Sequence, residues 1–102
     1  MTIIYEVNLS VDADILEEYV AWLQEHVRLM LQFPGFQSAE VFKEEVALNA
    51  PQHAFTVHYR LQNRDSLEHY FKENAAAMRE DGLRRFGGRF SASRRILELV
   101  KP

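Results

Sequence analysis

Residues 33–42 read FPGFQSAEVF, and this stretch decides how the chain folds. Apolar side chains recur at helical spacing before it, whereas apolar and polar residues alternate after it. Proline cannot continue a helix and glycine accepts a positive φ, so Pro34-Gly35 predicts a type II turn at the junction. We therefore expect a helix over 13–32, a corner closed by Phe33 and Phe36, and a strand over 37–46.

The same change of hydrophobic period divides the rest of the chain. It predicts strands over 2–9, 53–61 and 89–100, a second helix over 65–80, a cap on the first helix from Ser10 or Asp12, and an end or kink at Asp81-Gly82. The stretch LRRF at 83–86 could add a further helical turn before Gly87-Gly88. The order is βαββαβ. Right-handed crossovers and short connections then favour an α+β, ferredoxin-like fold, with a four-stranded antiparallel sheet and two helices on one face.

Length and composition limit the class of protein. The 102 residues suit one domain, 1–102, and 47 % hydrophobic with 26 % charged residues is ordinary for a globular protein. Without cysteine there is no disulfide or thiolate ligand. The sequence shows no apolar run of membrane-spanning length and no signal peptide at its start, so we expect a cytoplasmic protein with no membrane partner.

The net charge of −3 conceals an uneven distribution. Acidic residues prevail in 1–50 and basic residues in 51–102, where five arginines fall between positions 84 and 95: Arg84, Arg85, Arg89, Arg94 and Arg95. They form a solvated surface, a site for an anionic ligand near Gly87-Gly88, or a basic patch that meets an acidic patch on another subunit. Arg94 and Arg95 point to opposite faces of their strand, so they cannot both serve one site.

One face of the predicted sheet is left without helices. The apolar parity of the central strands, which includes Tyr5, Val57 and Tyr59, should face the helices. The opposite parity is mixed polar and apolar: Ile4, Glu6, Glu40, Phe42, Thr56, His58 and Arg60. Because Ile4 and Phe42 interrupt a polar face, we expect a second copy of the chain to cover it and form a homodimer. The alternative is a solvated face with scattered apolar residues.

Three features together resemble a known superfamily. They are a Pro-Gly-aromatic corner after the first helix, a tyrosine-bearing third strand, and a second helix that opens NRDSLEHYF at residues 63–71. The chain resembles the dimeric α+β barrel proteins, which include the antibiotic-biosynthesis-monooxygenase-like group, and within them a small bacterial family of unknown function that begins with a similar IIYEVNL strand. The resemblance implies two sheets that close into a barrel across a two-fold axis, with a pocket between helices and sheet. The resemblance does not imply a particular reaction for this chain, because Trp22 and His26 do not match the Asn/Trp/His set of the haem-degrading members.

His26 is the best single candidate for a catalytic residue. It falls in the apolar stripe of the first helix, where a histidine is either a satisfied, half-buried side chain or a proton acceptor inside a pocket. The candidate ligand-binding residues around such a pocket are Tyr5, Trp22, His26, Tyr59, Tyr70 and Asn74.

Other chemistries fit the sequence less well. His58, Glu6 and Glu40 could share a metal across strands, but no two of them have local metal-site spacing, so a polar network with Arg60 as counter-charge is favoured. The stretch IYEVNL at 4–9 approaches the first strand of RNA-recognition motifs, but that orientation would bury Glu6 and the third strand lacks the basic residue and glycine. We therefore expect no metal and no nucleic acid.

The leading hypothesis is a homodimeric protein that binds a small hydrophobic or aromatic ligand without a bound metal or organic cofactor. One alternative is a cofactor-independent monooxygenase- or isomerase-like enzyme that acts on an aromatic or polyketide-like compound, as the resemblance suggests. The other is a structural or regulatory dimerisation module. A pocket filled by Trp22, Tyr59 and Tyr70 would favour this module, whereas an open pocket with His26 at its wall would favour the first two.

Overall fold

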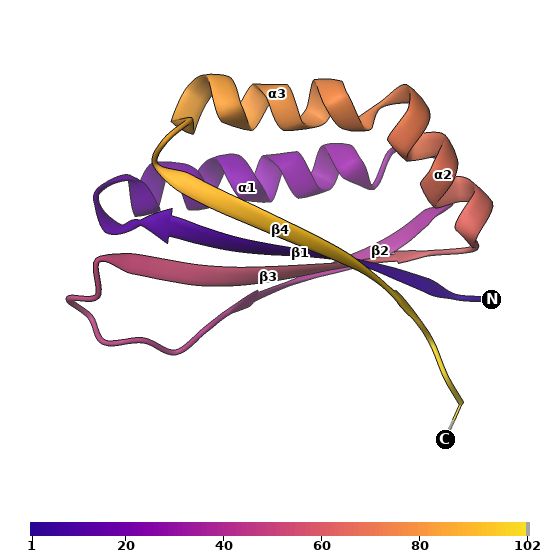
Figure 1. Ribbon diagram of the computed structural model, residues 1–102, viewed down its shortest axis with the longest axis horizontal. Coiled ribbons are helices and arrows are strands. Elements are labelled where there is room, and N and C mark those ends of the chain that lie inside the picture. Colours follow the sequence, from indigo (N-terminus) through magenta and orange to yellow (C-terminus); the bar gives the residue numbers. More distant parts are fainter. Residues whose placement is uncertain (102) are drawn as a thin grey trace.

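The computed structural model describes residues 1–101 and has the predicted α+β architecture (Figure 1). Its elements are β1 (Ile3–Asp12), a single 3₁₀ turn (Ala13–Ile15), α1 (Leu16–Met30), β2 (Phe36–Lys43), β3 (Gln52–Leu61), α2 (Arg64–Glu73), α3 (Ala75–Phe86) and β4 (Phe90–Glu98). The four strands form one antiparallel sheet in the order β2-β3-β1-β4. The ferredoxin-like fold expected from the order of elements is therefore confirmed.

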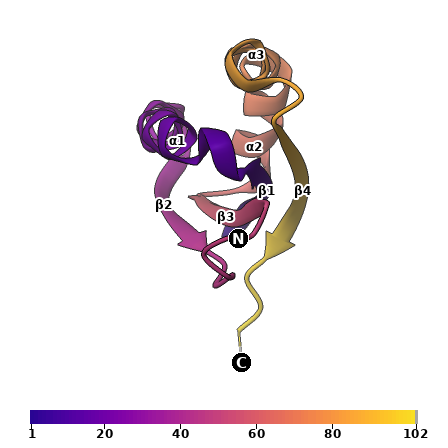
Figure 2. The ribbon, with the colours of Figure 1, turned by 90° about the vertical axis from the view of Figure 1, so that its left-hand side faces the viewer.

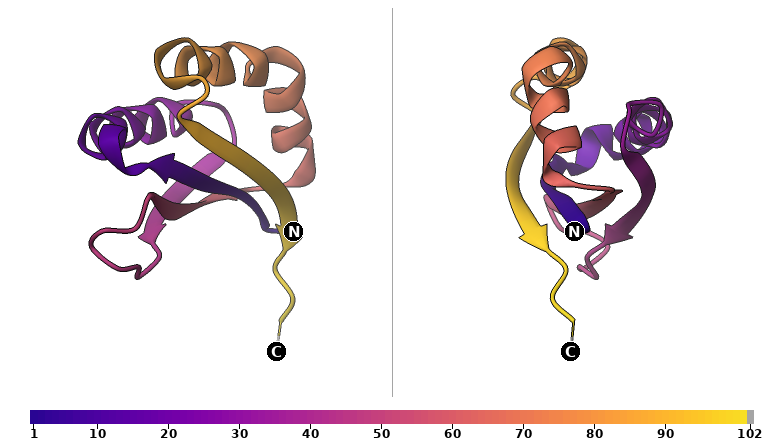
Figure 3. Two further views of the ribbon diagram at one scale, coloured as in Figure 1. Left: turned by 60° about the vertical axis from the view of Figure 1, so that its left-hand side comes forward. Right: turned by 90° about the vertical axis from the view of Figure 1, so that its right-hand side faces the viewer.

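All three helices lie on the same side of the sheet. Figure 2 shows α1 and α3 side by side above the strands, with β2 and β4 as the two edges. The two views of Figure 3 show α2 at the end of the sheet, where it turns the chain from β3 up into α3. The other face of the sheet carries no helix from residues 1–101, as the sequence predicts.

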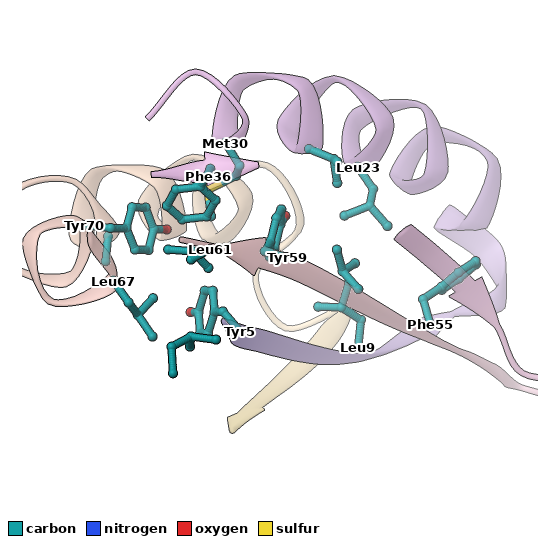
Figure 4. Packing of buried hydrophobic residues seen from close by; sticks show 14 of the residues in the cluster. Tyr5, Leu9, Leu23, Met30, Phe36, Phe55, Tyr59, Leu61, Leu67 and Tyr70 are labelled. Atoms are coloured by element: carbon teal, nitrogen blue, oxygen red, sulfur yellow. The ribbon is translucent and has the colours of Figure 1, made fainter. Parts of the chain in front are cut away.

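The core lies between the helices and the sheet (Figure 4). Tyr5, Val57 and Tyr59 are buried there, and Tyr5 is directly paired with Tyr59 across β1 and β3. The opposite parity pairs Ile4 with Arg60, Glu6 with His58 and Asn8 with Thr56. The division of the central strands into an apolar and a mixed face is therefore confirmed.

The corner at 33–36 is the predicted turn. The Phe36 N–H donates to the Phe33 carbonyl at 3.2 Å, and Gly35 in the third position of the turn has a φ of +84°. An added Cβ at Gly35 would lie 2.1 Å from the Ser66 hydroxyl oxygen at the start of α2. Glycine is thus required here both for its backbone conformation and for the close approach of the neighbouring helix.

The start of α1 differs from the prediction. We expected Ser10 or Asp12 to cap a helix, but β1 continues to Asp12 and the Asp12 side chain makes no cap hydrogen bond. The strand is longer because Ser10 and Val11 continue the pairing with β3 and β4, and Val11 is fully buried. The Asp12 carboxylate instead accepts hydrogen bonds from Gln52 Nε2 at 3.0 Å and Arg89 Nε at 3.3 Å.

The predicted single helix over 65–80 is two helices, and it does not end at Asp81-Gly82 but continues through the further turn expected over 83–86. Asn74 leaves helical geometry, with φ −129° and ψ −25°, and separates α2 from α3. Gly82 lies inside α3, where a Cβ would approach the Trp22 ring at 2.9 Å. This glycine lets α3 pack closely on α1 and does not end the helix. The helix ends at Phe86, before Gly88, whose φ is +82°.

Gly35→Ala should destabilise the protein strongly. The new Cβ would collide with Ser66 and would also sit at a positive φ, so we expect a loss of about 3–4 kcal/mol in the free energy of unfolding. Urea denaturation followed by circular dichroism measures this loss.

Gly88→Ala is the matched control. Its φ is nearly the same, but nothing lies within 4 Å of the position that a Cβ would take there, so only the backbone term of about 1–2 kcal/mol should appear. Equal losses in the two variants would contradict the requirement for close approach at Gly35.

Candidate functional site

A cavity of about 50 Å³ lies between the sheet, α1 and α3. Its floor is formed by helix-facing residues of the central strands, and its walls by α1, α2, α3 and β4. The lining residues that carry rings or charge are Tyr5, Tyr19, Trp22, His26, Tyr59, Tyr70, Arg79, Phe90 and Arg94. The aliphatic lining includes Leu23, Met30 and Met78. The cavity is therefore mostly aromatic, with a few polar groups on its wall.

Trp22 and His26 form one wall as a stacked pair. Their ring centroids are 4.6 Å apart with an interplanar angle of 24°, as their spacing of one helical turn on α1 allows. The Trp22 Nε1–H donates to Asp81 Oδ2 on α3 at 2.8 Å, and Asp81 is itself held by Arg84 at 2.9 Å and Arg85 at 3.1 Å. Asp81 thus fixes the indole ring, and the indole ring in turn supports His26.

Burial shifts the pKa values of groups in the cavity toward their neutral forms. The pKa of His26 is lowered by burial, against an opposing effect of the Asp81 carboxylate, so the imidazole is neutral at pH 7. Burial raises the pKa of Tyr70 to about 12 and raises that of Tyr59 as well. The site therefore offers a neutral imidazole and neutral phenols, which can accept a hydrogen bond from a ligand or donate one to it.

Two arginines reach the cavity in addition to the predicted residues. Arg79 on α3 donates from Nη2 to the Tyr5 hydroxyl oxygen at 3.1 Å, and its guanidinium lies 6.0 Å from the centre of the Phe71 ring. Arg94 lies on β4, opposite Val7 of β1, and lines the same cavity. Both arginines are exposed residues, so they line the cavity while remaining in contact with solvent.

The structure brings five of the six predicted ligand-binding residues to this cavity: Tyr5, Trp22, His26, Tyr59 and Tyr70. Asn74 is absent from the lining because it sits at the break between α2 and α3. Sequence reasoning assigned Arg94 to one face of its strand but did not connect it with this cavity, and it missed Arg79. The role of these residues in binding stays a prediction.

A second polar cluster lies on the uncovered face of the sheet, around Glu6. This carboxylate accepts hydrogen bonds from His58 Nε2 at 2.8 Å, Asn8 Nδ2 at 2.9 Å and the Arg95 guanidinium. Asn8 in turn accepts from the Thr56 hydroxyl at 2.7 Å. Glu6 is only 4 % exposed, and the hydrogen bond from Arg95, followed by those from Asn8 and His58, lowers its pKa to about 2.

The counter-charge to Glu6 was predicted wrongly. We expected Arg60, but Arg60 pairs with Ile4 and Ser38, one step further along the sheet. Arg95 fills the role because β4 places it directly opposite Glu6. The row continues through His58 to Glu40 on β2, while the Phe42 ring lies edge-on to His58 at 5.4 Å.

Two properties of residues 1–101 bear on the function classes. No group of three or more His, Cys, Asp or Glu residues there is arranged to hold a metal ion. None of the helices in the same range combines the length and apolar character needed to cross a membrane.

The fold is the one found in antibiotic-biosynthesis-monooxygenase-like proteins. SnoaB, a cofactor-independent oxygenase from Streptomyces nogalater, superposes with a TM-score of 0.73 at 10 % identity, over 100 % of this chain and 97 % of that one. A proposed antibiotic biosynthesis monooxygenase from Deinococcus radiodurans gives 0.74 at 15 %, over 98 % and 94 %. Another from Nitrosomonas europaea gives 0.71 at 13 %, over 99 % and 92 %. At these identities the likeness shows the fold alone.

The sequence itself belongs to the family described as Domain of unknown function (DUF4286), whose model matches residues 2–100. No curated protein matches the chain. The predicted resemblance to the monooxygenase-like group and to a small family of unknown function is confirmed.

Glu6→Gln should lower the free energy of unfolding near neutral pH and make it less dependent on pH in the acid range. The pKa of Glu6 in the folded protein, about 2, lies below its ordinary value of 4.5, so its stabilising contribution is complete above pH 4.5 and is lost as the pH falls toward 2. We expect a loss of about 1–3 kcal/mol at pH 7. Urea unfolding of both proteins between pH 7 and 3 measures it, and the difference between them should shrink across the acid range.

Glu40→Gln provides the comparison for this prediction. It removes a carboxylate from the same cross-strand row, but from an exposed position outside the hydrogen-bonded cluster of Glu6. It should change stability at pH 7 by less than about 0.5 kcal/mol. A loss as large as that of Glu6→Gln would show that Glu6 and Glu40 stabilise the protein through their negative charge and not through the hydrogen bonds of Glu6.

Proposed function

We propose that this protein is a homodimer that binds a small aromatic or hydrophobic molecule in the cavity between the helices and the sheet. The observation that carries the proposal is the cavity itself, because aromatic rings and a neutral His26 surround unfilled space in an otherwise close-packed core. That space favours binding over a purely structural dimerisation module, for which Trp22, Tyr59 and Tyr70 would fill the core.

The cavity must widen to admit a ligand. Its 50 Å³ is well below the roughly 300–1,000 Å³ of typical ligand sites. A groove between α1 and α3 lies beside it and shares Trp22, His26 and Met78 with its wall. Trp22 and His26 are only half buried, so rotation of this stacked pair would join the groove to the cavity. The Trp22–Asp81 hydrogen bond holds the Trp22–His26 pair in the closed position, and a ligand must break this hydrogen bond to enter.

The uncovered sheet face supports the homodimer. Its hydrogen bonds leave Glu6 nearly inaccessible and fully paired, which lowers the cost of covering this carboxylate with another surface. Phe42 is 47 % exposed at the edge of the same face, and Ile4 adds apolar area in its centre. A second copy that packs against this face would bury both residues and form the barrel that the fold class suggests.

A cofactor-independent enzyme is the second candidate, favoured by one specific observation. His26 is neutral at pH 7, stacked on Trp22 and adjacent to unfilled space, so it can accept a proton from a bound phenol or an activated carbon acid. The description of SnoaB as a cofactor-independent oxygenase is consistent with such chemistry in this fold. A monooxygenase- or isomerase-like reaction on an aromatic or polyketide-like compound would use His26 as base.

A thermal-shift screen of aromatic acids, phenols and lipids should find ligands that raise the melting temperature, since a ligand of the folded state stabilises it by mass action. His26→Gln should weaken binding of such a ligand by at least about tenfold. His69→Gln is the matched control, because His69 is exposed on α2 and lies outside the cavity lining. A His26→Gln protein that binds like the wild type would remove His26 from the site.

Thr56→Arg should convert the dimer to a monomer. Thr56 lies in the middle of the uncovered face, and a long cation there would clash with a sheet packed against it. Light scattering coupled to gel filtration should give twice the mass of one chain for the wild type and one chain mass for the variant. Leu83→Arg changes an exposed residue on α3, away from this face, and should leave the dimer intact. A monomeric wild type at tens of micromolar would contradict the homodimer.

A further inference from the structure

Most arginines of this chain are neutralised within it, and the exceptions are informative. Six of the nine form ion pairs with carboxylates of residues 1–101: Arg28, Arg64, Arg84, Arg85, Arg89 and Arg95. In the same described range, Arg60, Arg79 and Arg94 form none. Arg60 lies on the uncovered face, whereas Arg79 and Arg94 both line the cavity.

The position of Arg94 is unusual for its strand. The helix-facing positions of β4 are Phe90, Ala92, Arg94 and Ile96, and the other three pack in part against the core. Arg94 is exposed, yet it lines the cavity and has no carboxylate partner among the described residues. Its neighbour Arg95 faces the other way and is paired with Glu6, so the arginine pair as a whole is not simply a solvated surface.

No carboxylate balances these two charges inside the cavity. Among the described residues, the lining contains neither aspartate nor glutamate. The nearby Asp81 is already engaged with Trp22, Arg84 and Arg85. The charge of Arg94 also reaches across the site. Burial is the main cause of the lowered pKa of His26, and Arg94 adds a smaller lowering effect. Burial is also the main cause of the raised pKa of Tyr70, which Arg94 opposes by a smaller lowering effect. The described lining of the cavity thus includes two arginines and no carboxylate that pairs with them.

We propose that the cavity selects an aromatic carboxylate, with the ring among the tyrosines and the carboxylate against Arg79 and Arg94. This inference rests on the proposed function and specifies in addition that the ligand carries a negative charge. A guanidinium presents paired N–H donors that match the two oxygens of a carboxylate. Arg79 uses one donor on the Tyr5 hydroxyl and is braced against Phe71, which leaves its remaining donors for a ligand. The neutral phenols of Tyr59 and Tyr70 can contact the ring face or donate a further hydrogen bond.

Benzoate, benzamide and benzamidine test the charge directly, because they have nearly the same shape and carry negative, zero and positive charge. Each is titrated into the ¹⁵N-labelled protein at constant ionic strength. The chain has a single tryptophan, so the indole N–H cross-peak of Trp22 reports on the cavity wall without ambiguity. We expect benzoate to bind at least about tenfold more tightly than benzamide, and benzamidine to bind more weakly than both.

Variants assign the preference to the two arginines. Arg94→Gln and Arg79→Gln should each weaken benzoate about fivefold or more and leave benzamide unchanged, while Arg94→Lys should retain part of the benzoate affinity. Arg64→Gln removes the same charge from an exposed site on α2 and should change neither ligand. A proton spectrum of each variant confirms that it is folded.

The outcomes separate this inference from the proposed function. Equal binding of benzoate and benzamide would overturn the charge selection and leave a neutral ligand site in place. A benzoate preference that survives Arg94→Gln combined with Arg79→Gln would also overturn it. Failure of both benzoate and benzamide to shift the Trp22 peak at millimolar concentration would contradict the ligand site as well.

Discussion

The close approach of Gly35 to Ser66 is the constraint on which the rest of the structure depends. It joins three elements at one point: the end of α1, the first residue of β2 and the first turn of α2. The Gln62 N–H donates to the Gly35 carbonyl at 2.9 Å, and Asn63 caps α2 through the Ser66 N–H at the same distance. The corner therefore fixes where α2 starts, and the Phe36 ring meets Tyr70 of α2 at 5.3 Å. Through Tyr70 this corner also shapes the end of the cavity.

The strand β1 divides the molecule into two chemically different sides. Consecutive residues Tyr5 and Glu6 point in opposite directions, the first into the aromatic cavity and the second into the cluster with His58 and Arg95. The edge strand β4 repeats the arrangement, since Arg94 faces the cavity and Arg95 faces Glu6. A pleated strand alternates its side chains, so ligand binding and assembly can occupy two faces of one thin sheet. Changes on one face then need not disturb the other.

Hydrophobic period and strand parity were enough to predict the fold, the corner and the two faces of the sheet, because these depend on local sequence and on a period of two. They also predicted that Tyr5, Tyr59 and His26 face the space between the helices and the sheet. The break at Asn74 and the position of Gly82 inside α3 were missed. The position of Gly82 depends on a tertiary contact, because glycine leaves the room that the Trp22 ring needs. Arg95 was not recognised as the partner of Glu6 because the register between β1 and β4 cannot be read from either strand alone.

A shared fold at 10–15 % identity preserves backbone geometry and leaves function to the side chains of the cavity. Here the side chains suggest that binding and protonation are coupled. Burial is the main cause that lowers the pKa of His26, and Arg94 adds a smaller lowering effect, so an anion that offsets the charge of Arg94 would remove that smaller effect. By reciprocity, protonation of His26 would strengthen binding of that anion. The same coupling limits any catalysis, because His26 could act as a base only while it stays unprotonated with the ligand in place. If the proposed site binds such an anion, the pKa of His26 in the complex would decide whether His26 can also serve as a base.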